Sequence, residues 1–364
     1  MKIKSKLLLT PSNFVPSFKD WSIQGVLNPA AIRLPNKKIV LYVRVAESHG
    51  QDISKKNVTC PIMTSESEFK SEKVLKKNIV RKDRSGILFL KDGSCRLPTL
   101  SHFKKVILNE DGFKIESIEE KPAFVGKPKD GDYGVEDPRI VKIGKDYLMT
   151  YVNVSKDEGV STSLAISKDL INWKRMGIIF PEQNKDVIFF PEKINGNYVV
   201  LHRPEGNFEF SKPSVWIGYS KDLIYWGKTK AIMHPRKDSW EESRIGGGTP
   251  PIKTKKGWLC IYHGVKVIIH ERTKDETGIY SAGAVLFDLK NPEKILARTS
   301  IKKPLFKPQY SYEKKGFIGN VIFPTGIVET LDKKSVLLYC GGADTNIVVK
   351  EIKIDDILKS LEWG

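Results

Sequence analysis

Hydrophobic residues along this chain gather in short runs that are bounded by glycine, asparagine, aspartate and lysine. Representative runs are KIVLYVRVA (38–46), YLMTYVNV (147–154), YVVLHRP (198–204), GWLCIYHGV (257–265) and SVLLYCGGA (335–343). Runs of β-branched and aromatic residues, whether alternating or solid, are typical of β-strands. The turn sequences IGKDY and INGNY favour tight hairpins. The pattern therefore predicts an all-β chain, and helical spacing is clear only in DDILKSLEW (355–363), near the C-terminus.

A seven-residue phrase occurs twice, as SKDLINW (167–173) and SKDLIYW (220–226). Looser versions are NEDGFKI (109–115) and FDLKNPEKI (287–295), which lie near other strand-like runs. A four-stranded antiparallel unit that recurs at this spacing is typical of a β-propeller blade. We therefore predict that residues 1–364 form a single domain, a five-bladed β-propeller with a short C-terminal helix. A pair of β-sandwiches is the alternative, but it would not explain the repeated phrase.

The chain carries a formal net charge of +18, which raises the question of an anionic partner. Nucleic acid, a membrane surface and a small anionic substrate would each match this charge. Many lysines are dispersed in turns, and the densest basic stretch, inside the polar segment 50–85, accompanies no nucleic-acid-binding motif. We expect this segment to form a long excursion between strands, and we expect neither nucleic acid nor a membrane as a partner.

The four cysteines (Cys60, Cys95, Cys260 and Cys340) lack the spacing of a zinc cluster or a disulfide framework. The opening residues MKIKSKLLLTPSN contain too short an apolar run for a secretory signal, and no run approaches the length of a membrane span. We therefore expect a cytoplasmic protein that needs no metal ion.

Charged and amide residues recur at the ends of the predicted inner strands. In a propeller these strands line a central funnel, so residues that are far apart in the sequence would meet there. Taken singly, each would more often be a turn cap, an ion pair between blades or a buried histidine. Together they predict a polar central site, and they are Asn28, Arg44, Asp137, Arg139, Lys193, Arg244, His263 and Asp344.

Several motifs resemble those of glycoside hydrolase family 130, in the order in which that family has them. They are GVEDPRI (134–140), FPEKINGNYVVLHRP (190–204), RIGGGTPPI (244–252), GWLCIYHGV and FPTGIV followed by LLYCGGADT. The similarity runs from about residue 20 to about residue 355, and RLPTLSHF (96–103) points to the branch acting on mannobiose, mannooligosaccharides and mannosyl-N-acetylglucosamine. The resemblance implies a five-bladed propeller, and most members of this family are phosphorylases acting on β-mannosides.

Inverting cleavage of a glycoside requires an acid for the leaving oxygen and a nucleophile on the opposite face of the sugar. A hydrolase also needs a carboxylate base that activates water. A phosphorylase does not, because phosphate is already an anion and needs cations that hold it in line. A phosphorylase is therefore expected to show one catalytic carboxylate facing a basic cradle.

The resemblance assigns the catalytic acid to Asp137, which would act through a sugar hydroxyl that relays the proton, while its neighbour Glu136 is expected to brace a nearby cation. It assigns phosphate binding to Arg175, Lys193 and His263, with Tyr262 beside them. Sugar-binding residues would be Asn28, Arg44, Arg96, His102, Arg139, His202, Arg203, Arg244 and Asp344; of these, Arg244 would contact either sugar or phosphate. Trp173 and Trp226 lie in the repeated phrase and are assigned to the core.

We therefore expect an inverting β-mannoside phosphorylase. It would convert a β-mannoside and inorganic phosphate, the co-substrate, into α-mannose 1-phosphate and a shortened sugar, reversibly and without another cofactor. A β-mannosidase and a non-catalytic sugar-binding propeller are the alternatives. The linkage, β-1,2 or β-1,4, the acceptor sugar and the formation of a homo-oligomer stay open at this stage.

Overall fold

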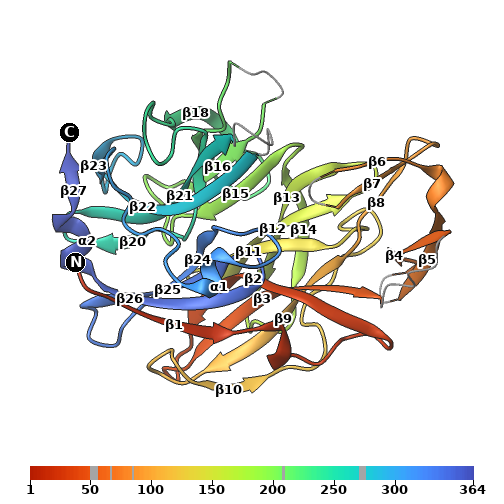
Figure 1. Cartoon of the computed structure of the whole chain (residues 1–364). Helices are drawn as coiled ribbons and strands as arrows, with labels where there is room; N and C mark the ends of the chain where they lie inside the picture. The colour runs from red at the N-terminus through yellow and green to blue at the C-terminus, as the bar shows by residue number, and fades with distance from the viewer. Residues whose placement is uncertain (50–55, 66–67, 84–85, 207–209, 270–275) are drawn as a thin grey trace.

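The computed structural model describes residues 1–49, 56–65, 68–83, 86–206, 210–269 and 276–364. Over these residues the chain consists mainly of β-strands, with α-helix only in α1 (Ser311–Lys314) and α2 (Ile354–Lys359) (Figure 1). The predicted all-β class is confirmed. The predicted C-terminal helix is also present as α2, but it ends early, because Leu361–Trp363 form the edge strand β27 against β23.

Five antiparallel sheets contain most of the strands. The first sheet consists of β2 (Trp21–Arg33), β3 (Ile39–His49), β9 (Leu100–Leu108) and β10 (Ile115–Ile118). The second consists of β11 (Val135–Ile143), β12 (Asp146–Ser155), β13 (Gly159–Ser167) and β14 (Lys174–Phe180). The third consists of β15 (Asn184–Phe189), β16 (Tyr198–Pro204), β17 (Val215–Ser220) and β18 (Gly227–Met233).

The last two sheets are completed by strands from the two ends of the chain. The fourth contains β19 (Arg244–Gly247), β21 (Gly257–Ile269), β22 (Glu276–Phe287), β23 (Ile295–Thr299) and β27, with β20 (Ile252–Thr254) paired to β21. The fifth contains β24 (Ile322–Glu329), β25 (Ser335–Gly342), β26 (Asn346–Lys353) and β1 (Ile3–Leu9). Because β1 pairs with β26, the fifth sheet joins the beginning of the chain to its end.

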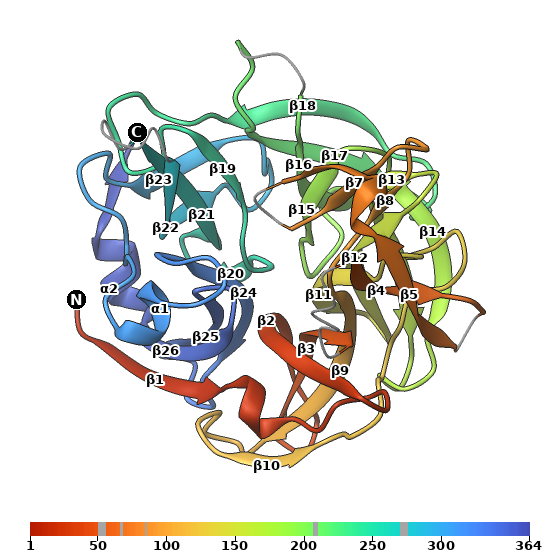
Figure 2. The ribbon, with the colours of Figure 1, turned by 45° about the vertical axis from the view of Figure 1, so that its right-hand side comes forward.

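The five sheets lie side by side around a common centre (Figure 2). The first strand of each sheet lies nearest this centre, and β2 contacts both β24 and β11. The contacts continue from β11 to β15, from β15 to β19, and from β21 back to β24. Five separate hydrophobic cores fill the five junctions between neighbouring sheets. Burial between sheets, rather than within one central core, therefore stabilises the arrangement.

The repeated phrase occupies equivalent turns, each between the third and fourth strands of a sheet. In the second sheet the Ser167 hydroxyl accepts hydrogen bonds from the Asp169 and Leu170 amides, and Asp169 accepts bonds from the next two amides. Ser220 and Asp222 make the same bonds in the third sheet. The prediction that the phrase marks a repeated unit is confirmed at the level of these turns. Trp173 and Trp226 pack against hydrophobic cores, as predicted.

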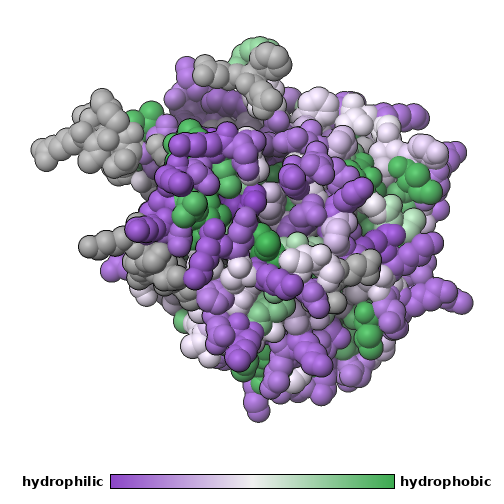
Figure 3. All heavy atoms as spheres, turned by 90° about the vertical axis from the view of Figure 1, so that its right-hand side faces the viewer, coloured by the Kyte–Doolittle hydropathy of each residue, from purple (hydrophilic) through white to green (hydrophobic). Residues whose placement is uncertain are grey.

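A long excursion separates β3 from β9 and carries two small sheets. Its strands are β4 (Asn57–Met63), β5 (Phe69–Leu75), β6 (Ile79–Lys82), β7 (Leu88–Leu90) and β8 (Cys95–Arg96). Parts of segment 50–85 lie outside the described residues. The face toward which the excursion projects is covered mostly by hydrophilic side chains (Figure 3). Among the described residues, no helix combines the length and apolar character that crossing a bilayer requires.

Candidate active site

A cavity of about 490 Å³ opens at the centre of the five sheets. Every sheet contributes polar or aromatic side chains to its wall. These side chains are Asn28, Arg44, Glu136, Asp137, Lys185, Asp186, Arg203, Glu205, Arg244, His263, Tyr280, Phe323 and Asp344. Apolar residues of the excursion, Ile87, Leu97 and Pro98, line another part of the cavity. The cavity therefore combines many ionisable groups with an apolar margin.

β-bulges in the first strands bring several of these residues to the cavity. The strand register shifts between Leu27 and Ala30 in β2, between Glu136 and Arg139 in β11, and between Lys185 and Ile188 in β15. A bulge bends its strand and redirects the side chains beside it.

One short polar residue in each of these bulges adopts a left-handed conformation. Asn28, Asp137 and Asp186 have φ angles of 39°, 48° and 56°. Asparagine and aspartate tolerate this region better than other residues with a Cβ, because their side chains can bond locally. In three sheets, a bulge residue with a left-handed conformation thus presents an amide or a carboxylate to the cavity.

Asp137 is held on one wall of the cavity, which we call the acid wall (Asn28, Arg44, Glu136 and Asp137). Its Oδ1 accepts hydrogen bonds from Asn28 Nδ2 at 2.9 Å and from an Arg44 guanidinium nitrogen at 3.0 Å. The other terminal nitrogen of Arg44 donates to Glu136 Oε1 at 2.6 Å. Glu136 therefore holds the cation that holds Asp137, which is the bracing role predicted for it.

Asp137 is ionised near neutral pH. Burial raises the pKa of its carboxyl, but the charges of Arg44 and Arg139 and the hydrogen bond from Asn28 outweigh burial and leave the pKa below its usual range. Arg139 is buried beneath the wall, where its Nε donates to the Gly248 carbonyl at 2.7 Å and another nitrogen donates to the Asp137 carbonyl at 2.8 Å. Arg139 thus fixes the backbone beneath the acid wall, and the cavity lining does not include its side chain.

Asp344, in the turn after β25, lines the same cavity but has a different ionisation. Burial raises its pKa to about 6; the charge of Arg44 opposes this shift, and the carboxylates of Asp137 and Glu136 add to it. Asp344 therefore gains a proton at a much higher pH than Asp137 does.

The third and fourth sheets supply the other cations of the lining, and we call their part the cation wall (Lys185, Asp186, Arg203, Glu205, Arg244, His263 and Tyr280). Arg203 Nε donates to Asp186 Oδ2 at 2.6 Å, and another Arg203 nitrogen donates to Glu205 Oε1. Arg244 donates to the Tyr280 hydroxyl at 2.8 Å and lies 3.7 Å from the same Glu205 oxygen. Two guanidinium groups thus converge around one carboxylate.

His263 completes the cation wall as a neutral imidazole. Burial lowers its pKa to about 4; the charge of Asp186 opposes this shift, and the charges of Arg203 and Arg244 add to it. Its Nε2 lies 3.7 Å from Asp186 Oδ2, and its buried Nδ1 has no hydrogen-bond partner among the described residues. A neutral histidine can donate a hydrogen bond to an anion or accept one from a hydroxyl.

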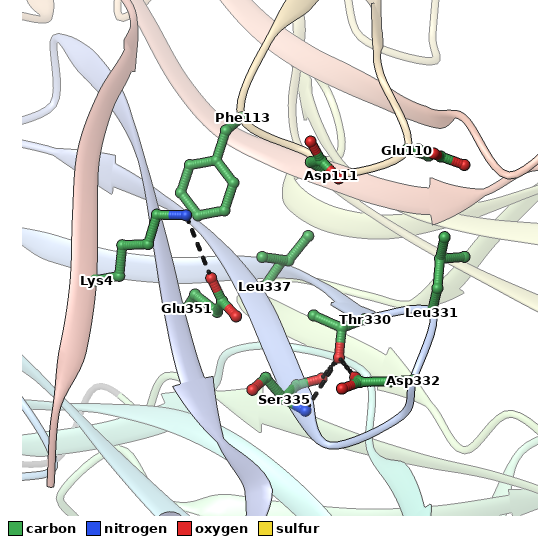
Figure 4. A pocket seen from close by; sticks show the side chains of 10 residues that line it. All are labelled: Lys4, Glu110, Asp111, Phe113, Thr330, Leu331, Asp332, Ser335, Leu337 and Glu351. Carbon is green, nitrogen blue, oxygen red and sulfur yellow. Dashed lines mark hydrogen bonds and ion pairs between the residues drawn. The ribbon is translucent and has the colours of Figure 1, made fainter.

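A second pocket of about 410 Å³ lies on the outer side, at the junction of the first and fifth sheets (Figure 4). Its polar groups already have partners, since Lys4 lies 3.6 Å from Glu351 and Thr330 donates to Asp332 at 2.7 Å. None of the predicted site residues lines it. Within the described ranges, no group of three or more histidine, cysteine, aspartate or glutamate side chains is placed to hold a metal ion.

Comparisons with known proteins point to the same family as the order of the sequence motifs does. A family model described as beta-1,4-mannooligosaccharide phosphorylase, that of glycoside hydrolase family 130, matches residues 33–363. The chain belongs to glycoside hydrolase family 130. Among relatives in this family, the 1,2-beta-oligomannan phosphorylase of Thermoanaerobacter sp. is 40% identical over 69% of this chain and 78% of its own.

A second family 130 relative, the beta-1,2-mannobiose phosphorylase of Listeria innocua, is 33% identical over 98% of this chain and 96% of its own. A solved structure of the Listeria innocua beta-1,2-mannobiose phosphorylase, in complex with beta-1,2-mannobiose, superimposes with a TM-score of 0.85 at 32% identity. This superposition covers 99% of each chain. The likeness therefore extends over the whole of both folds.

The structure places three of the four predicted phosphate ligands outside the cavity lining. Arg175 lies on β14, the fourth strand of its sheet, where it donates to Asp130 at 2.6 Å and to the Val125 carbonyl. Lys193 lies exposed in the turn after β15, 4.2 Å above the Tyr198 ring. The cavity lining includes neither residue, and their assignment to phosphate stays a prediction, because the motif match gives residue order and not the strand or the turn that a residue occupies.

Tyr262 also points away from the cavity, although its neighbour His263 lines it. Successive side chains of a strand face opposite sides, so the two cannot share the cavity. The Tyr262 hydroxyl instead donates to Glu241 at 2.6 Å and accepts a hydrogen bond from Arg298 at 3.1 Å. Of the predicted phosphate set, only His263 reaches the cavity lining.

Three of the residues predicted to bind sugar likewise have structural partners elsewhere. Arg96 donates to Glu72 at 2.5 Å within the excursion. The ring of His102 is buried, with its Nε2 2.7 Å from Glu47. His202 is buried against Phe180, and its Nδ1 lies 3.0 Å from the Asn184 amide nitrogen. These three do not line the cavity. Five predicted sugar-binding residues do, and they are Asn28, Arg44, Arg203, Arg244 and Asp344.

The sequence analysis missed Lys185, Asp186, Glu205 and Tyr280. A signal for Asp186 was present, because NKDVIF opens the third sheet as VEDPRI opens the second and LNPAAI lies in β2. Aligning the first strands would have shown Asn28, Asp137 and Asp186 as equivalent. No comparable signal marks Tyr280, which lies within the long hairpin of β21 and β22.

Proposed function

We propose that this chain is an inverting β-mannoside phosphorylase that releases α-mannose 1-phosphate. The observation that carries this proposal is one cavity with an anchored carboxylate on one wall and two guanidinium groups with a histidine on the other. This is the separation of acid and anion-binding groups that phosphorolysis requires. The named activities of family 130 relatives support the same reaction.

Asp137 is the proposed proton source, acting through a hydroxyl of the bound mannosyl unit. Because the charges of Arg44 and Arg139 hold the pKa of Asp137 below its usual range, bound substrates have to raise that pKa. Two events supply this rise: the sugar excludes water from the acid wall, and phosphate brings negative charge into the cavity. Asn28 and Arg44 fix the position of the Asp137 carboxylate. Asp344 is available to form hydrogen bonds with sugar hydroxyls.

Arg203, Arg244 and His263 form the proposed phosphate site. Guanidinium groups match phosphate oxygens with paired hydrogen bonds, and a neutral imidazole adds a further donor. Asp186 anchors Arg203 at 2.6 Å and keeps it in place without phosphate. Arg244, which the motif match left between sugar and phosphate, belongs in this proposal to the phosphate site.

The same contacts argue against the hydrolase alternative. A hydrolase requires a free carboxylate base on the side opposite the acid. The carboxylates of the cation wall, Asp186 and Glu205, are both bonded to Arg203. In the structure both carboxylates are thus paired with a cation, and the cations around them suit an anionic nucleophile.

We further propose β-1,2-linked mannosides as the first substrate class to test, because the relatives from Thermoanaerobacter and Listeria named above carry that linkage in their names. For the architecture we propose a five-bladed β-propeller formed by one domain. Five sheets around one centre, five inter-sheet cores and the β1–β26 pairing support this arrangement.

The test is phosphate dependence. With β-1,2-mannobiose as substrate, we expect α-mannose 1-phosphate to form only when inorganic phosphate is present. Asp137→Asn keeps the hydrogen bonds but removes the proton source, and we expect it to lower kcat by about 10³-fold or more. Asp157→Asn, in the exposed turn between β12 and β13, is the matched control and should keep wild-type activity. Release of free mannose at full rate without phosphate would establish a hydrolase instead.

A further inference from the structure

Glu205 places a carboxylate of the chain between the two arginines assigned to phosphate. It lies just after β16, and its Oε1 accepts a hydrogen bond from Arg203 and lies 3.7 Å from Arg244. All three side chains line the cavity. An anion of the chain itself therefore offsets part of the positive charge that phosphate would meet.

Asp186 and Glu205 hold Arg203 in different ways. The Asp186 side chain is 4% exposed and is fixed in the bulge of β15, whereas the Glu205 side chain is 24% exposed. If Glu205 moved away, Arg203 would keep its bond to Asp186 and its position. Asp186 is thus the anchor of the cation wall, and Glu205 is the partner that can be exchanged.

We propose that Glu205 is the built-in counter-anion of the phosphate site and the residue that sets its affinity for phosphate. This inference rests on the proposed function. A phosphate dianion and the Glu205 carboxylate compete for the same two guanidinium groups, and like charges brought together repel. Phosphate therefore binds only as Glu205 is displaced from Arg203 and Arg244, and no covalent step is involved.

Competition between Glu205 and phosphate affects turnover in an enzyme that catalyses its reaction in both directions. Without Glu205, Asp186 alone would offset the charge of Arg203 and Arg244. The two arginines would then bind small anions more tightly and release α-mannose 1-phosphate more slowly. A carboxylate that returns to the arginines as the product leaves lowers the affinity for both anions together. Glu205 thus lowers the affinity for phosphate and speeds the release of α-mannose 1-phosphate, while Asp137 and the acid wall are unaffected.

The test measures binding of inorganic phosphate to the full chain by isothermal titration calorimetry. Glu205→Gln removes the charge but keeps an oxygen that can accept from Arg203, and Glu205→Ala removes both. We expect Glu205→Gln to bind phosphate roughly tenfold more tightly, which corresponds to about 1.4 kcal/mol. Glu192→Gln is the control, because Glu192 is an exposed carboxylate paired with Lys253 at 2.5 Å on an outer turn. In kinetics, the KM for phosphate should fall while the KM for the mannoside stays unchanged.

The outcomes separate this inference from the proposed function. Unchanged or weaker phosphate binding by Glu205→Gln, with an intact fold by circular dichroism, would overturn the inference and identify Glu205 as a residue that orients the arginines. Tighter phosphate binding without phosphorolysis of any β-mannoside would support the inference and reject the function. A wild-type chain that binds no phosphate would reject both.

Discussion

At the scale of single residues, the most informative contrast is between the carboxyl groups of Asp137 and Asp344. Both are buried beside Arg44, yet the pKa of one is lowered and that of the other is raised to about 6. The difference follows from partners: Asp137 accepts bonds from Arg44 and Asn28, whereas no hydrogen bond to the Asp344 carboxylate is found among the described residues. The hydrogen-bonded carboxyl group of Asp137 is ionised, whereas burial keeps a proton on the Asp344 carboxyl group up to a higher pH.

This contrast predicts a pH-dependent stability for the chain. The pKa of Asp344 is about 6 when folded and near 3.8 when unfolded. Between these values the folded chain holds a proton that the unfolded chain has released, so Asp344 lowers the free energy of unfolding as the pH rises, by on the order of 2–3 kcal/mol in total. Asp344→Asn should abolish this fall and stabilise the chain near neutral pH relative to wild type.

Urea unfolding followed by circular dichroism at about pH 4 and about pH 7 measures the effect. The difference between variant and wild type should be larger at the higher pH. Asp157→Asn, in an exposed turn, is the control and should show no such trend. An equal difference at both pH values would mean that Asp344 ionises normally.

The sequence predicted those site residues whose side-chain chemistry suits the site and whose strand positions place them at the cavity. Asn28, Arg44 and Asp137 were predicted for the site and do line the cavity. Tyr262 was not separable from His263 by sequence, because the two are neighbours and only the strand orientation decides which of them faces inward. The position of Arg175 on the outer strand β14 depends on the whole sheet and could not be read from its motif, so its assignment to phosphate stays a prediction.

At the scale of elements, most of the site comes from the first and second strands of the sheets around the centre. The first strands supply bulge residues, and the second strands supply the partner opposite them. Arg44 pairs with Leu27, Arg203 with Lys185, and His263 with Gly246. The third and fourth strands supply little of the lining. The repeated turns share a recognisable phrase, whereas the bulges share only one short polar residue in each first strand. This weaker signal is why Asp186 and Lys185 were missed.

This division predicts opposite behaviour for two arginines. Arg175→Ala, on β14, loses its bond to Asp130 and its packing on Phe124, and it should lower the free energy of unfolding by about 1–3 kcal/mol with the KM for phosphate unchanged. Arg244→Ala, on β19, should raise the KM for phosphate about tenfold or more with little effect on stability.

Steady-state kinetics with varied phosphate, together with thermal unfolding, distinguishes the two variants. A large rise in the phosphate KM of Arg175→Ala at unchanged stability would return Arg175 to the phosphate site and contradict its position on β14.

At the scale of the whole molecule, the pairing of β1 with β26 connects the ends of the chain. Leu9 is fully buried in the core between the fifth and first sheets. Leu9→Ala should therefore destabilise the whole molecule by about 2–5 kcal/mol. Val15, which is 59% exposed, provides the control Val15→Ala, expected to change stability by less than about 0.5 kcal/mol.

Chemical unfolding monitored by tryptophan fluorescence gives both values. If Leu9→Ala unfolds like Val15→Ala, then β1 contributes no more to the stability of the molecule than an exposed segment does.

The same end-to-end pairing has a consequence during protein synthesis. Asn28 and Arg44 leave the ribosome early, but Asp344 and the partner of β1 are made only with β25 and β26. A nascent chain can assemble its middle sheets, yet it holds an incomplete cavity and an unpaired N-terminal strand throughout translation. A polypeptide that stops before β25 lacks Asp344 and the strand that pairs with β1, so we expect it to be inactive although it contains Asp137, Arg203 and Arg244.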